Sequence, residues 1–78
     1  MHRRAIDVRL RIINGLAYPR TLVLEPWTTE RVLHPGEAVD LLASGDPAYP
    51  LEIEVADDRI VVYCFDSEGA VMTVVGEE

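Results

Sequence analysis

Hydrophobic and polar residues alternate with a period of two along most of the chain, and no sustained helical period interrupts the pattern. This alternation is typical of β-strands with one buried and one solvated face. It predicts seven short strands, of which the third covers Thr29–Leu33, the sixth Arg59–Phe65 and the seventh Ala70–Val75. The other four are defined by the alternating residues Ile6, Val8, Leu10 and Ile12; Leu22 and Leu24; Val39, Leu41 and Ala43; and Leu51, Ile53 and Val55.

Turn-forming residues separate these strands. Asn14-Gly15 follows the first strand, and both residue types tolerate positive φ. Pro26 ends the second strand because proline cannot donate to a ladder. His34-Pro35-Gly36-Glu37 has proline second and glycine third, as in a type II turn. Further turns are predicted at Asp57-Asp58 and Asp66–Gly69, and Ser44–Pro50, with its two prolines, is predicted to be the longest irregular segment.

Seven short strands at close spacing favour an all-β fold, a small antiparallel β-sandwich, in one domain spanning residues 1–78. Immunoglobulin-like and cupredoxin-like topologies both fit this number of strands. Arg59–Phe65 is apolar on both faces, which predicts a central strand. The residues expected to form much of the core are Ile6, Val8, Leu10, Leu22, Leu24, Leu41, Ile53, Val55, Val61 and Tyr63.

The length of 78 residues leaves room for a single hydrophobic core. A chain of this size buries only about 60% of the surface that it exposes when unfolded. The only cysteine, Cys64, cannot form an internal disulfide. Oligomerisation is a common way to stabilise such small domains, so a homodimer is expected.

The net charge is −7, and the charges are unevenly distributed. Residues 1–20 hold five arginines and one acid, whereas the rest hold two arginines and thirteen acids. Free nucleic acid requires a concentrated basic face and is therefore not an expected partner. All basic residues except the histidines are arginines, which suggests a GC-rich bacterial genome.

The longest apolar run, Ile60–Phe65, is far too short to cross a bilayer. The Met-His-Arg-Arg start is not followed by the apolar region of a signal peptide. We therefore expect a cytoplasmic protein with no membrane partner.

A transition-metal site is not expected. A blue-copper site needs two histidines, a cysteine and usually a methionine. His34, Cys64 and Met72 are the only plausible trio, and the second histidine that should follow the cysteine closely is absent. His2 is the only other imidazole. The sequence thus predicts no metal and no other cofactor.

No catalytic residue is predicted, and the protein is not expected to be an enzyme. Ser44 and Ser67 lie in turn-like sequence without a neighbouring histidine. A Cys64–His34 dyad would require the fold to bring the two side chains together. Glu52 and Glu54 share a strand face, as the outer residues of any half-solvated strand do.

Four residues are candidates for contact with a partner. Trp27 follows a proline at the end of a strand, where it either covers one end of the core or is an exposed contact residue. Tyr18 and Tyr49 each precede a proline, which predicts extended loop backbone. Val74 belongs to Ala70–Val75, a strand without charge that could pair with a second copy if it lies at an edge.

Two segments resemble a known set of proteins. Leu22–Trp27 reads Leu-Val-Leu-Glu-Pro-Trp, and Leu33–Glu37 contains Pro-Gly-Glu. They resemble a set of small uncharacterised bacterial β proteins with a Leu-Glu-Pro-Trp corner and a later Pro-Gly-Glu turn, over roughly Asn14 to Ile60. That set has no assigned activity, so the resemblance implies a compact β fold and no catalytic residue.

Three hypotheses of function follow. The first is a non-enzymatic interaction module that binds another protein or itself. The second is a small-ligand-binding or enzymatic β-sandwich that uses the Ser44–Pro50 loop and Trp27 as a pocket. The third is an acidic mimic that blocks a nucleic-acid-binding protein, which requires carboxylates aligned on one face.

Overall fold

The structure is a computed structural model that describes residues 6–65 and 69–75. These residues form seven strands and no helix, and hence no helix that could span a membrane. The strands are β1 (Ile6–Ile13), β2 (Arg20–Glu25), β3 (Thr29–Leu33), β4 (Ala38–Gly45), β5 (Glu52–Val55), β6 (Arg59–Tyr63) and β7 (Val71–Val75).

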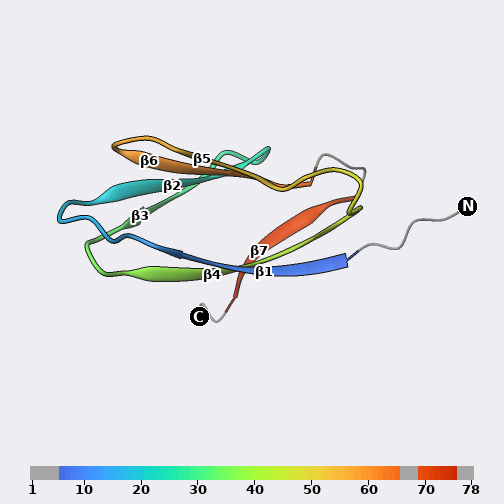
Figure 1. Ribbon diagram of the computed structural model, residues 1–78, viewed down its shortest axis with the longest axis horizontal. Coiled ribbons are helices and arrows are strands. Elements are labelled where there is room, and N and C mark those ends of the chain that lie inside the picture. The colour runs from blue at the N-terminus through green and yellow to red at the C-terminus, as the bar shows by residue number, and fades with distance from the viewer. Residues whose placement is uncertain (1–5, 66–68, 76–78) are drawn as a thin grey trace, which may run out of the picture.

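Two sheets pack face to face, which confirms the predicted all-β sandwich (Figure 1). One sheet has the order β1-β4-β7 and the other β3-β2-β6-β5. Every pairing is antiparallel except β2 with β6, which is parallel. The larger sheet therefore consists of two hairpins, β2–β3 and β5–β6, joined along a parallel seam. This order differs from the immunoglobulin constant domain, where strands 1, 2, 5 and 4 form one sheet.

The core lies between the two sheets. On the larger sheet, Leu22, Leu24, Ile60 and Val62 point inward, and Val39, Leu41 and Ala43 meet them from β4. β6 lies between β2 and β5, which confirms the prediction of a central strand. Its inner residues are Ile60 and Val62, while Val61 is buried on the outer face beside Val23.

Four residues expected in the core are exposed. Ile53 and Val55 share the inner face with Val62 and Ile60, but β5 is an edge strand of a four-stranded sheet that faces only three strands. Val55 is consequently 67% exposed. Ile6, at the outer end of β1, is also exposed. Tyr63 lies on the outer face, since its register partners are Glu25 and Glu52.

The turns differ in part from their predictions. Gly36 has a φ of 83°, and Glu37 N donates to the His34 carbonyl at 2.9 Å, which confirms a type II geometry. Asn14 and Gly15, whose residue types tolerate positive φ, do not adopt it; among non-glycine residues of the described ranges it occurs at Thr28. The irregular segment predicted at Ser44–Pro50 begins only after Gly45, because β4 continues through Gly45, which pairs with Ile6 of β1. The turn predicted at Asp66–Gly69 lies outside the described residues except for Gly69.

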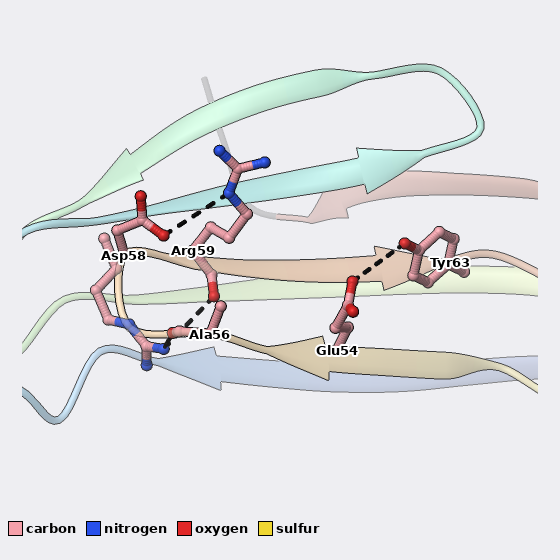
Figure 2. Close-up of polar contacts among 6 residues, drawn as sticks. Glu54, Ala56, Asp58, Arg59 and Tyr63 are labelled. Atoms are coloured by element: carbon pink, nitrogen blue, oxygen red, sulfur yellow. Dashed lines mark hydrogen bonds and ion pairs between the residues drawn. The ribbon is translucent and has the colours of Figure 1, made fainter.

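The β5–β6 turn is fastened to the beginning of β2. Thr21 N donates to the Asp58 carbonyl at 2.9 Å, and Arg20 Nη2 donates to the Ala56 and Arg59 carbonyls. Arg59 forms an ion pair with Asp58 at the same place (Figure 2). These bonds fix the register of the parallel seam.

Candidate functional site

The four predicted contact residues lie in three places. Trp27 is at the tip of the β2–β3 hairpin, and it lines one hollow together with Val74. Tyr49 lines a second hollow, next to Pro26 of the same hairpin. Tyr18 lies at the other end of the sandwich, where its carbonyl accepts a hydrogen bond from Asn14. The structure therefore brings Trp27 and Val74 together and leaves Tyr18 apart.

Trp27 lies in a tight bend between β2 and β3. The Glu25–Pro26 peptide is cis, and Thr28 has a φ of 57°. Glu25 Oε1 accepts hydrogen bonds from the backbone N of Thr28 at 3.1 Å and from its Oγ1 at 3.0 Å. The indole is 44% exposed, so Trp27 is an exposed residue and not a buried cover over the core.

The first hollow, of about 400 Å³, extends from Trp27 along β7. Its walls are largely apolar and include Leu24, Met72 and Val74. Val74 points inward, because its register partner is the buried Leu41, and it packs against the core. Val71 and Thr73 lie on the opposite face of β7 and are exposed.

The second hollow, of about 360 Å³, lies at the same end of the molecule and is called here the Tyr63 pocket. Glu25, Tyr63 and Glu52 form a row across its base, because Tyr63 is the register partner of Glu25 on β2 and of Glu52 on β5. The remaining walls come from Pro26, Tyr49, Pro50, Cys64 and Phe65. Aromatic rings and two carboxylates thus line one cavity.

Three carboxylates act on the phenol of Tyr63. Figure 2 shows Glu54 and Tyr63 pointing toward each other from adjacent strands, and the Tyr63 hydroxyl donates to Glu54 Oε1 at 3.3 Å. The pKa of Tyr63 is raised, first by the charge of Glu54, then by burial and the hydrogen bond to Glu54, and finally by the charges of Glu25 and Glu52. The pocket is therefore electronegative.

The candidate metal and nucleophile residues are not brought together. His34 follows β3 at the end of the sheet where β2 begins, whereas Cys64 follows β6 at the end where β2 finishes. At about 3.3 Å per strand residue, more than roughly 15 Å separates them. Among residues 6–65 and 69–75, no group of three His, Cys, Asp or Glu side chains could hold a metal ion.

Cys64 is buried, and its Sγ donates to the Val71 carbonyl at 3.4 Å. Burial also raises the pKa of the thiol, which lowers the fraction of reactive thiolate. We expect a disulfide reagent near pH 8 to label native protein at least about tenfold more slowly than protein unfolded in urea. Equal rates in the two states would show that Cys64 is accessible.

Sequence reasoning did not identify Glu25 or Tyr63 as site residues. Tyr63 was assigned to the core, and no role was assigned to Glu25. The antiparallel β5–β6 hairpin places Glu52 beside Tyr63, and the parallel pairing of β2 with β6 places Glu25 on the other side of Tyr63. Parallel pairing between strands so distant in sequence leaves no local signal.

No protein-family model, curated protein or solved structure matches the chain. The resemblance of Leu22–Trp27 and Leu33–Glu37 to small bacterial β proteins therefore stays a prediction, and the geometry described above is the basis for the function.

Proposed function

We propose that the protein is a non-enzymatic interaction module that pairs with a second copy of itself through the outer edge of β7. One observation carries this proposal: β7 is an edge strand, and Val-Met-Thr-Val-Val contains no charged residue. An edge strand presents unpaired backbone groups that can pair with another chain.

The other edge strands of the described structure all carry charge. β1 contains Asp7, Arg9 and Arg11, β3 contains Glu30 and Arg31, and β5 contains Glu52 and Glu54. Charged edge residues discourage pairing between sheets. Self-pairing at β5 would also place glutamates opposite glutamates, which is unfavourable. A chain with a net charge of −7 therefore meets the least repulsion at β7.

A twofold axis through Thr73 would pair β7 with its copy in antiparallel orientation and join two three-stranded sheets. Val71 of each copy would then lie opposite Val75 of the other. Such an interface is self-complementary, as a symmetric dimer requires. The exposed indole of Trp27 lies beside the same strand and adds apolar surface.

The alternative functions receive less support. The proposed ligand pocket combined Trp27 with the Ser44–Pro50 loop, but Trp27 and Tyr49 line different hollows. An acidic mimic needs carboxylates aligned on one face. Register places Glu25, Glu30, Glu52 and Glu54 on the outer face of the larger sheet, yet Val32, Arg59 and Tyr63 lie among them.

A lysine on β7 tests the dimer. Val71→Lys adds a charge to an outward residue that is 52% exposed, so the fold should tolerate it. We expect it to weaken self-association at least about tenfold, because it replaces the apolar cross-strand contact with Val75 of the second copy by a charge on the pairing edge. Val32→Lys is the matched control, since Val32 is 51% exposed on another edge strand. Val74→Lys is unsuitable because Val74 packs against the core.

Light scattering across a hundredfold concentration range provides the readout. A dimer that is lost in Val71→Lys and kept in Val32→Lys supports the proposal. A monomer at all concentrations, or equal weakening by both lysines, would refute pairing through β7.

A further inference from the structure

The Tyr63 pocket has the composition of a site for an organic cation. Strands in a sheet are about 4.8 Å apart, so the Cα atoms of Glu25 and Glu52 are roughly 10 Å apart, with Tyr63 between them. A second ring, Tyr49, and two prolines line the same cavity. The cavity volume of about 360 Å³ lies within the range of about 300–1,000 Å³ that is typical of ligand pockets.

Three arginines of the described ranges are engaged away from the pocket. Arg11 pairs with Asp40, Arg59 pairs with Asp58, and Arg20 donates to backbone carbonyls at the far end of the sheet. One carboxylate oxygen of Glu25, Oε1, accepts the hydrogen bonds from Thr28. A cation that enters between Glu25 and Glu52 would therefore find acceptors on both sides and an aromatic face below.

The geometry favours a flat cation. Guanidinium is planar, stacks on aromatic rings and donates two parallel hydrogen bonds to a carboxylate. An ammonium group is a compact, strongly hydrated charge. Contact with an aromatic ring stabilises it less than it stabilises guanidinium, and its desolvation in a half-open cavity costs more free energy. The two glutamates flank the ring of Tyr63 from opposite sides, which suits a plane of donors lying over that ring.

We propose that the Tyr63 pocket binds the guanidinium group of an arginine side chain presented by a basic segment of a protein partner. The group stacks on Tyr63 and donates to Glu25 and Glu52, while Tyr49 and the prolines contact the aliphatic part of the side chain. This site lies on the opposite sheet from the proposed β7 interface and does not depend on it.

The test uses three blocked pentapeptides, Gly-Gly-X-Gly-Gly, in which X is arginine, lysine or citrulline. Amide shifts of the labelled protein are followed at about 150 mM salt, where diffuse surface attraction is screened. We expect saturable binding of the arginine peptide, with a Kd on the order of 1 mM for a single anchoring side chain. The shifts should centre on Tyr49, Glu52 and Tyr63. The lysine peptide should bind about tenfold more weakly, and the uncharged citrulline peptide should not bind.

Two charge-matched variants locate the site. Glu52→Gln removes an exposed carboxylate of the row and should weaken arginine binding about tenfold. Glu30→Gln removes the same charge from the same sheet face, on β3, and should change the Kd less than about twofold. Neither variant should alter self-association, which distinguishes failure of this proposal from failure of the β7 dimer.

Four outcomes would overturn the proposal: no saturable binding of the arginine peptide, equal affinity for the lysine peptide, shifts centred away from the Tyr63 pocket, or equal losses in Glu52→Gln and Glu30→Gln. The last result would mean that a diffuse negative field, and not this pocket, attracts the peptide.

Discussion

Replacing Asn14 with alanine should destabilise the protein by about 3 kcal/mol, through the loss of hydrogen bonds at a buried position. Asn14 is 0% exposed. Its Nδ2 donates to the carbonyls of Tyr18 at 2.9 Å and Leu33 at 2.8 Å, and its Oδ1 accepts from Leu16 N at 3.0 Å. The side chain thus joins the β1–β2 loop to the end of β3. Alanine would leave these three backbone groups without their partner.

The effect would be large for a domain of this size. At about 0.05–0.15 kcal/mol per residue, the total stability is roughly 4–12 kcal/mol. A loss of about 3 kcal/mol should lower the Tm by roughly 12–24 °C in a thermal melt. Tyr18→Ala is the control, since it removes a half-exposed ring but keeps the carbonyl that Asn14 binds. If the two variants melt together, water replaces the asparagine at little cost.

The strands could be predicted because local sequence determines them. Alternation and one continuous apolar run identified all seven, and proline and glycine in His34–Glu37 identified a type II turn. The uncharged composition of the last strand was visible as well, and the structure places that strand at an edge. Each of these features depends on neighbours within a few residues.

Features that depend on the pairing of distant strands could not be predicted. Asn14 was interpreted only as a turn residue, yet its side chain is a buried donor and acceptor between loops. Ile53 and Val55 alternate like core residues, but the smaller sheet does not cover β5. Their exposure reflects an unequal number of strands in the two sheets, which no local pattern records.

The candidate sites also differ in whether local sequence or the pairing of distant strands determines them. Trp27 and Val74 were selected by residue type and strand composition, and the fold brings them together. The row of Glu25, Tyr63 and Glu52 combines three strands and a parallel seam, so its members share no sequence spacing. Tyr63 was misassigned because a strand that is apolar on both faces gives no indication of which face is inner.

Replacing Gly45 should have the second large effect on stability. The sequence places this residue in the irregular segment Ser44–Pro50, which gives no indication that it packs tightly in the structure. Gly45 is the last residue of β4 and is buried on the inner face with Ala43 and Leu41. A Cβ at this position would lie 2.6 Å from Cβ of Phe65 and 2.7 Å from its Cγ. Because Phe65 is itself buried and the close atoms include its Cβ, rotation of the ring cannot relieve the overlap. We therefore expect Gly45→Ala to destabilise the fold by about 1–3 kcal/mol through overpacking.

Urea unfolding of two further variants separates this steric effect from the general effect of adding a methyl group. Gly15→Ala should be neutral or stabilising by up to about 1 kcal/mol, because a Cβ there meets no atom within 4 Å and the unfolded chain loses entropy. Phe65→Ala removes Cγ and Cδ2, two of the three atoms that Gly45→Ala would strike, and gives the remaining Cβ room to shift. The double variant should therefore lose less stability than the sum of the two single variants, with a coupling of about 1 kcal/mol. Strict additivity would mean that the backbone, and not Phe65, is responsible for the requirement for glycine at this position.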